Sequence, residues 1–291
     1  MELWISAAIQ GLATGMLALG VYLSYRIARF ADITVDGTFT SGAVCVALVS
    51  QRGGSPWLGL VAAFAAGALS GAVTGGLFAW LRISDLLAGI LTMTALYSIN
   101  LRMMGGSNLP VSGPELVTGL IPASIPRGVG VMGVYAALVV GVALTLRAAL
   151  RTDAGLAWRA SGENLDLSVA LGIPALATKV LVLALANGLA AMSGALSAGY
   201  NGFADISSGI GSLVTGIGAL MIGERLIPRR GHGPLSLEAG LLAATLGALA
   251  YRLLVTIALQ AGLAPTDLRL ITAVLVLIAI AIPRLRGRRA A

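Results

Sequence analysis

The chain has 291 residues, of which 57% are hydrophobic and only 11% are charged, and its mean hydropathy is +0.93. A soluble domain carries roughly 25% charged residues, so this composition excludes an ordinary soluble protein and indicates an integral membrane protein. The net charge of +7 would suggest a nucleic-acid partner in a soluble protein, but membrane topology explains it better, and no nucleic acid is expected.

About nine apolar segments are expected to form one membrane domain, residues 1–291, surrounded by membrane lipid. They are Leu3–Ser24, Val35–Ser50, Trp57–Leu81, Asp85–Met104, Val129–Leu150, Pro174–Gly199, Ile206–Ile222, Leu237–Gln260 and Leu268–Ile282. The second and seventh segments are short and follow polar, glycine-containing stretches, as broken or re-entrant helices of transporters do. The predicted fold is therefore all-α, a polytopic bundle of about nine transmembrane helices.

Basic residues are distributed unevenly between the two sides of this predicted bundle. If the N-terminus lies outside, 14 of the 19 basic residues fall on inner segments and 4 on outer segments. The inner set is Arg26, Arg29, Arg82, Arg147, Arg151, Arg159, Lys179, Arg225, Arg229, Arg230, Arg284, Arg286, Arg288 and Arg289. Cytoplasmic loops carry such an excess, which predicts a multi-pass protein of the inner or plasma membrane with its N-terminus outside and its C-terminus in the cytoplasm.

Small residues recur every four positions along several of the spans. The stripes are Gly59, Ala63, Gly67, Gly71 and Gly75; Ala186, Ala190, Gly194 and Ala198; and Gly240, Ala244 and Ala248. Small side chains let helices approach closely in lipid, so these stripes predict a tightly packed bundle and indicate no chemistry by themselves.

Two pairs of short segments resemble each other. Gln10–Leu19 is similar to Asn187–Leu196, and the residues Phe-Ala-Asp-Ile at 30–33 recur at 203–206. The charge distribution puts the first Phe-Ala-Asp-Ile at the inner surface and the second at the outer surface, as in an inverted repeat. Inverted repeats are typical of transporters, although small-residue sequences also match by chance.

The motifs of common enzymes are missing from the sequence. A P-loop needs Gly-Lys followed by Ser or Thr, but the single lysine, Lys179, follows Thr178. The sequence has no His-Glu-x-x-His and no Gly-x-Ser-x-Gly. His232 is the only histidine and Cys45 the only cysteine, so no metal site is expected. The chain is therefore expected to be neither an enzyme nor the holder of a cofactor.

Polar side chains inside apolar spans are costly in lipid and so mark candidate sites. One side of the fourth span carries Asp85, Gly89, Thr92, Leu96 and Asn100, with Tyr97 beside them. One interpretation is a polar lining for a solute path. The other is that Asp85 caps the helix start while Thr92 and Asn100 form hydrogen bonds across helices.

Four further charged residues are candidates for the translocation path. Asp32, Asp36 and Asp205 lie at the entries to the two short spans, where they either cap helices or flank helix N-termini that favour an anionic substrate group. Arg252 is the one basic residue inside a span. It either extends toward the membrane surface or faces the interior, where Asp205 or a substrate carboxylate would pair with it.

The longest polar stretch in the chain is Arg151–Pro174. Leu165 and Val169, like Leu167 and Leu171, are four residues apart, which predicts a short helix with an apolar side. Gly172 is placed to end that helix and Pro174 to open the next one. A firm cytoplasmic helix between two spans can dock a protein outside the bilayer.

Residues 159–173 resemble the cytoplasmic coupling segment of ABC-importer permeases of the branched-chain amino acid/ribose superfamily. The similarity is closest to the tryptophan/tyrosine-type permease group, and there it extends to Asp85–Gly105, Gly202–Glu224 and Pro265–Thr272. It implies a type II importer fold and ATPase coupling, within segment 151–173, through Arg159, Gly162, Glu163, Asn164 and Gly172. Residues 207–208 are Ser-Ser where this group has larger residues, so the resemblance does not name the solute.

The resemblance also implies a set of partners. They are a second copy of the chain, two ABC ATPase subunits that bind ATP and Mg, and an extracytoplasmic solute-binding protein. The alternative function is an ion-coupled secondary transporter built from inverted repeats. Loss of transport when ATP is depleted, with the ion gradient held, would separate these two functions.

Overall fold

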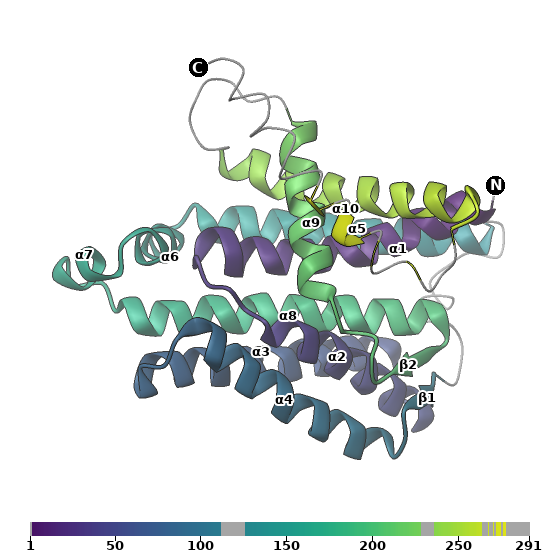
Figure 1. Ribbon diagram of the computed structural model, residues 1–291, viewed down its shortest axis with the longest axis horizontal. Helices are drawn as coiled ribbons and strands as arrows, with labels where there is room; N and C mark the ends of the chain where they lie inside the picture. The colour runs from purple at the N-terminus through teal and green to yellow at the C-terminus, as the bar shows by residue number, and fades with distance from the viewer. Residues whose placement is uncertain are drawn as a thin grey trace.

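A computed structural model describes residues 2–111, 126–227 and 236–263, together with residues 267, 270, 272–274, 276 and 277. These residues form a helical bundle (Figure 1). In chain order the elements are α1 (Glu2–Val21), the π-helix η1 (Tyr22–Ile27), α2 (Thr34–Gln51), α3 (Pro56–Leu81), α4 (Asp85–Met104), β1 (Asn108–Pro110), α5 (Arg127–Leu150), α6 (Asp153–Glu163), α7 (Leu165–Ala170), α8 (Ala175–Asn201), β2 (Phe203–Asp205), α9 (Ser212–Leu226) and α10 (Leu237–Gln260). His232 and most of the predicted ninth span lie outside the described residues, as do residues 112–125 between the fourth and fifth predicted spans.

Six helices in the described part of the chain are long and apolar enough to cross a membrane. They are Glu2–Ile27, which joins α1 to η1, and then α3, α4, α5, α8 and α10. These helices match six of the predicted spans. The two predicted short spans correspond to α2, with 18 residues, and α9, with 15. The prediction that the seventh span begins at Ile206 is wrong, because residues 206–211 form a turn and α9 begins at Ser212.

Helix boundaries follow from local residue chemistry. The side chains of Ser84 and Thr152 accept hydrogen bonds from the backbone N–H groups three residues later, and so cap α4 and α6. Gly105 and Gly202 end α4 and α8 with φ angles of +66° and +82°, a conformation that favours glycine. Ser84 therefore holds the capping position that one interpretation of the sequence gave to Asp85.

Close helix packing follows the predicted stripes of small residues. α3 lies against α8, where a Cβ atom at Gly67 would overlap the carbonyl oxygen of Asn187 and one at Gly71 that of Leu183. A Cβ atom at Gly194 of α8 would likewise overlap the carbonyl oxygen of Phe39 in α2. The prediction that these stripes bring helices close together is confirmed for α3 and α8, whereas a Cβ atom at Gly240 of the third stripe would meet the side chain of Tyr22.

The two ends of the bundle differ in structure (Figure 1). At one end α6 and α7 project from the long helices; we call this the α6–α7 end. At the other, the ribbon end, β1 and β2 pair antiparallel with Asn108 opposite Asp205. The sequence did not predict this pair of strands.

The two similar segments of the chain have the same order of elements. In each, a long helix is followed by a Phe-Ala-Asp-Ile segment and then by a short helix: α1–η1 leads to α2, and α8 leads to α9. The first of these segments is irregular and borders the α6–α7 end, whereas the second contains β2 and lies at the ribbon end (Figure 1). This arrangement is the one that an inverted repeat predicts.

The start of α9 is capped by a carboxylate from another helix. Asp36, in the first turn of α2, accepts hydrogen bonds from the backbone N–H groups of Gly211 (2.9 Å) and Leu213 (2.8 Å). These N–H groups have no partner within α9, and their positive partial charge favours a carboxylate. Asp36 thus stabilises α9 rather than its own helix, and α9 lies across the long helices (Figure 1).

A second aspartate, Asp32, is fully buried within the bundle. Its carboxylate accepts hydrogen bonds from the side-chain amide of Asn187 (2.5 Å) and from the backbone N–H of Thr34 (3.0 Å). The amide oxygen of Asn187 in turn accepts a hydrogen bond from the Thr38 hydroxyl (3.0 Å). This network joins the start of α2 to the middle of α8.

Replacing Asn187 with alanine is expected to destabilise the bundle by about 1–3 kcal/mol, because Asp32 loses a buried hydrogen-bond donor. The midpoint of thermal unfolding of the purified protein measures this loss. Asn201→Ala is the matched control, because Asn201 lies exposed on the same helix; it should change the stability by less than about 0.5 kcal/mol. Equal midpoints for the two variants would contradict a stabilising role for the Asp32–Asn187 hydrogen bond.

Candidate functional site

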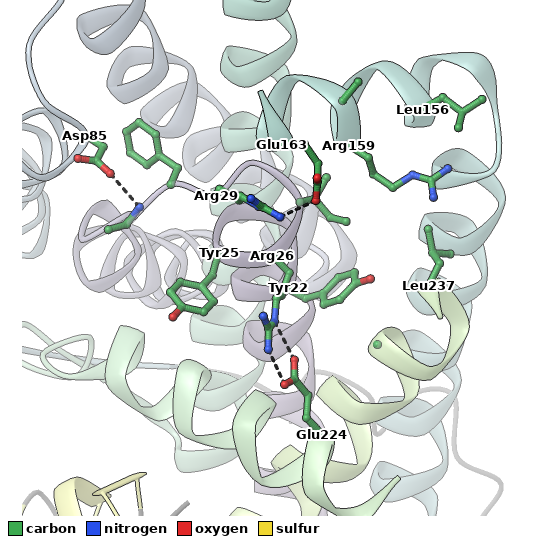
Figure 2. A pocket seen from close by; sticks show the side chains of 15 residues that line it. Tyr22, Tyr25, Arg26, Arg29, Asp85, Leu156, Arg159, Glu163, Glu224 and Leu237 are labelled. Atoms are coloured by element: carbon green, nitrogen blue, oxygen red, sulfur yellow. Dashed lines mark hydrogen bonds and ion pairs between the residues drawn. The ribbon is translucent and has the colours of Figure 1, made fainter. Parts of the chain in front are cut away.

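A cavity of about 880 Å³ opens at the α6–α7 end of the bundle (Figure 2). Its walls come from η1 and the loop after it, α6, the start of α4, and the adjoining ends of α9 and α10. It therefore lies where the predicted coupling segment meets the membrane-spanning helices. Three arginines and three carboxylates line it, so their formal charges cancel.

An ion pair in this cavity joins η1 to α9. The Arg26 guanidinium donates to both carboxylate oxygens of Glu224, with an Nε–Oε1 distance of 2.8 Å and an Nη2–Oε2 distance of 2.5 Å (Figure 2). The side chain of Glu224 is 10% exposed and that of Arg26 is 42% exposed. A bidentate pair of this kind fixes the relative position of two elements more firmly than a single contact does.

A second ion pair joins the loop after η1 to the last residue of α6. Arg29 Nη2 lies 2.5 Å from Glu163 Oε1, and the two side chains point toward one another in Figure 2. Both side chains are more than half exposed, so this pair contributes little stability. Arg29 has a φ angle of +49°, an unusual conformation for a residue other than glycine.

The backbone of the predicted coupling segment is held by three of its residues. A Cβ atom at Gly162 would overlap the carbonyl oxygen of Ile27, so glycine lets α6 lie against η1. The Asn164 side chain caps α7 by accepting a hydrogen bond from the N–H of Leu167 (3.0 Å). Gly172 follows α7 with a φ angle of +80°, as the sequence predicted.

The two charged residues to which the resemblance assigns ATPase coupling, Arg159 and Glu163, differ in their surroundings. Glu163 is already paired with Arg29. Arg159 lines the cavity, and its Nε donates a long hydrogen bond to its own helix, at the carbonyl oxygen of Gly155 (3.4 Å). No ion pair joins Arg159 to a carboxylate in the part of the chain that the structure describes. Arg159 is thus the charged residue here with a guanidinium available to another molecule.

α7 and the residue that ends it, Leu171, expose three apolar side chains. Leu167, Val169 and Leu171 are 56%, 57% and 69% exposed, whereas Ser168 is the one buried residue of α7. In Figure 1 α7 lies at the tip of the α6–α7 end. An apolar cluster on a polar projection is typical of a protein interaction site. We call Leu167, Val169 and Leu171 the α7 cluster.

The polar residues of α4 make contacts across helices. Thr92 Oγ1 accepts a hydrogen bond from the Thr74 hydroxyl of α3 (2.9 Å), and Asn100 bonds to Ser41 of α2 (2.9 Å). The structure thus shows the hydrogen bonds of the packing interpretation. Asp85 lies at the cavity, and its Oδ2 accepts a weak hydrogen bond from the N–H of Ala31 (3.4 Å). Tyr97 is 48% exposed on another side of α4.

The remaining path candidates lie away from this cavity. Asp32 and Asp36 have the internal partners described above, and Asp205 is the last residue of β2. Arg252 of α10 faces α1, where its Nε donates to Thr14 Oγ1 (3.2 Å). No ion pair joins it to Asp205, a described residue like itself. A role in the translocation path stays a prediction for all these residues.

Sequence reasoning missed Arg26, Arg29 and Glu224 as site residues. The two arginines entered only as part of the positive charge of the inner side. The available signal was Glu224 itself, an acidic residue at the end of an apolar segment, since such a residue is usually paired.

Comparisons with known proteins agree with this architecture. The family model described as "Branched-chain amino acid transport system / permease component" matches residues 3–281. The tyrosine transport system permease protein of Clostridioides difficile is 36% identical over 274 residues, which cover 94% of this chain and 88% of the relative. Uncharacterized protein RP368 of Rickettsia prowazekii is 34% identical and covers 96% and 97%.

A solved structure shares the fold. A chain of PsaBC from Streptococcus pneumoniae in complex with Fab aligns with a TM-score of 0.53 over 95% of this chain and 90% of that chain, at 17% sequence identity. This likeness concerns the fold alone and confirms the predicted all-α membrane bundle. With the family model spanning nearly the whole chain, the protein belongs to the family of branched-chain amino acid transport system permease components.

Proposed function

We propose that this chain is the membrane-spanning subunit of an ABC importer and forms the path for an amino acid or a related solute. Two copies assemble with two ATPase subunits, which bind ATP and Mg, and a solute-binding protein delivers the solute. The observation that carries this proposal is the α7 cluster, an exposed apolar surface on a helix that projects from the membrane bundle. The chain has no P-loop of its own, so a docked ATPase would supply the energy.

The α7 cluster is suited to receive force from a partner. Asn164 caps one end of α7 and Gly172 closes the other, which makes this six-residue helix a defined unit. α6 contacts both α7 and η1, so a partner that moved α7 would also move α6 and η1.

From α6 a connected route leads to the centre of the bundle. Glu163 pairs with Arg29 beside η1, Arg26 of η1 pairs with Glu224 of α9, and Asp36 of α2 caps the start of α9. Motion of α6 can therefore reach α9 and α2 through direct contacts. We assign this route the task of linking ATP hydrolysis to the opening of the solute path.

An amino acid is the favoured class of solute. The family is described by branched-chain amino acid transport, and the Clostridioides difficile relative by tyrosine transport. Both solutes carry the same α-amino and α-carboxylate groups and differ in their side chains. Amino acids are therefore the proposed class of solute, and uptake measurements decide which side chain is preferred.

The test of this function is uptake into proteoliposomes that contain the chain, its co-purified ATPase and the solute-binding protein. Uptake of radiolabelled amino acid should require ATP and should stop when ATP is depleted while ion gradients are maintained. Uptake that depends on the ion gradient and not on ATP would instead identify a secondary transporter.

The proposed orientation has its own test. The charge distribution predicts an extracytoplasmic N-terminus and a cytoplasmic C-terminus. A reporter that fluoresces only in the cytoplasm, fused after Ala291, is expected to be bright. A bright signal from the same reporter at the N-terminus, with a dark C-terminal fusion, would show that the orientation is reversed.

A further inference from the structure

A second, smaller cavity lies toward the ribbon end and has polar and charged walls. Its volume is about 140 Å³, and α1, α2, α8, β2 and α10 all contribute to its lining. The charged, amide and aromatic side chains that line it belong to Arg252, Asp205, Gln10, Asn201, Phe39 and Phe203. An apolar cavity of ~150 Å³ can hold benzene, so a cavity of this size can admit a small organic molecule.

Arg252 brings an incompletely used guanidinium to this cavity. One of its five N–H donors bonds to Thr14 Oγ1 through Nε (3.2 Å). No ion pair or further hydrogen bond of its guanidinium joins it to the residues described. An arginine within a membrane span is costly unless it is paired, so a carboxylate ligand would be stabilised here.

Asp205 brings the opposite charge to the same cavity. Its Oδ1 accepts hydrogen bonds from the N–H (2.8 Å) and the hydroxyl (2.5 Å) of Ser207, and these bonds hold the carboxylate in the turn after β2. Its Oδ2 accepts no hydrogen bond within the described ranges. A cation and an anion thus line one small cavity without forming an ion pair with each other.

From this geometry we infer that the cavity is a binding site for the head group of an α-amino acid. The α-carboxylate pairs with Arg252, whose planar guanidinium matches a carboxylate, and the α-ammonium pairs with Asp205. This inference rests on the proposed function and assigns the residues that hold the two charged groups of its solute. It also explains why Arg252 and Asp205 line one cavity without forming an ion pair with each other.

Other lining residues suit the rest of such a ligand. The side-chain amides of Gln10 and Asn201 make no hydrogen bond in the part of the chain that is described, so they can bond to the head group. Phe39 and Phe203 offer aromatic surface to an apolar side chain, and Phe203 is 45% exposed. A side chain too large for the cavity could extend past Phe203.

The inference is tested by equilibrium binding to the purified full-length chain in nanodiscs. The twenty standard amino acids are the first probes. The tightest binder is then compared with its decarboxylated amine and its deaminated acid. The parent protein should prefer the amino acid to either analogue by about tenfold or more, since each analogue leaves one charged residue unpaired.

The two charged residues should each control one half of this preference. Arg252→Gln should abolish the preference over the amine and keep the preference over the acid, and Asp205→Asn should do the reverse. Arg252→Lys should weaken carboxylate recognition while keeping the charge, which covers the case in which Arg252→Gln does not fold. The matched control is Arg52→Gln. Arg52 is exposed at the ribbon end, so its replacement should leave both binding preferences unchanged.

The failure of this site is distinguishable from the failure of the proposed function. If no amino acid binds, or if both preferences survive Arg252→Gln, Arg252→Lys and Asp205→Asn, the site is refuted even when the ATPase co-purifies. If no ATPase co-purifies, the importer function fails whatever the binding result.

Discussion

Replacing Leu167 and Leu171 together with aspartate is expected to abolish co-purification of the ATPase subunit and, with it, ATP-dependent uptake. Leu167 of α7 and Leu171, which follows it, are 56% and 69% exposed, so the substitutions disturb little inside the chain. In a docked complex each aspartate would be buried without a partner, at a cost of several kcal/mol. Even a loss of about 3 kcal/mol weakens binding more than a hundredfold. Affinity capture from detergent extract, followed by uptake in proteoliposomes, measures both effects.

A matched control excludes a general effect of added charge. Leu263, 45% exposed after the C-terminal end of α10, lies toward the opposite end of the bundle. Leu263→Asp should therefore leave ATPase capture unchanged. If the double α7 variant folds, elutes as the parent does and still captures its ATPase, α7 is not the docking element. Equal loss in both variants would point to instability of the bundle instead.

Local residue chemistry was sufficient to predict much of the helical framework. The stripe through Gly67 and Gly71 predicted the close approach that α3 makes to α8, because a missing side chain matters wherever two backbones meet. Gly172 predicted the end of α7, because a left-handed residue favours glycine. Such features depend on one residue and its near neighbours, so they can be inferred without the fold.

Features that join distant segments could not be predicted in the same way. The start of α9 depends on Asp36, which is remote in sequence, and no residue near Ser212 indicates that partner. Strand β1 has three residues, too few for an alternating pattern. Periodicity grouped Leu167 with Leu171 but could not tell whether that side faces the bundle or the partner.

The candidate sites, too, were predictable from the sequence only in part. The coupling segment was found from its composition and its resemblance to known permeases, yet its ion-pair partner Arg29 belongs to the turn after η1. Arg252 stood out as a charge within a span. One interpretation of the sequence already placed Arg252 near Asp205, but the cavity that they share with α1, α2 and α8 required the fold. Isolated unusual residues can be recognised from sequence, whereas the sites that they form depend on topology.

Neutralising Glu224 is expected to separate ATP hydrolysis from transport. In Glu224→Gln the ATPase should still bind and hydrolyse ATP within about twofold of the parent rate, because the α7 cluster is untouched. Uptake should fall about tenfold or more. The amide cannot replace the bidentate ion pair with Arg26, and charged hydrogen bonds contribute about 1.5–3 kcal/mol. With this pair weakened, motion of η1 no longer reaches α9.

A double-mutant cycle with a control carboxylate makes the Glu224 prediction specific. If the pair acts as a unit, Arg26→Gln combined with Glu224→Gln should transport no worse than either single variant. The control is Glu238→Gln, which removes a carboxylate that pairs with Arg147 and Arg151 at the same end of the bundle but lies outside the route from η1 to α9. Its ratio of solute imported to ATP hydrolysed should match that of the parent. An equal ratio in Glu224→Gln and the parent would show that force reaches α9 by another route. A lower ratio found only in the Arg26 and Glu224 variants would identify this ion pair as the link between the coupling helices and the centre of the bundle.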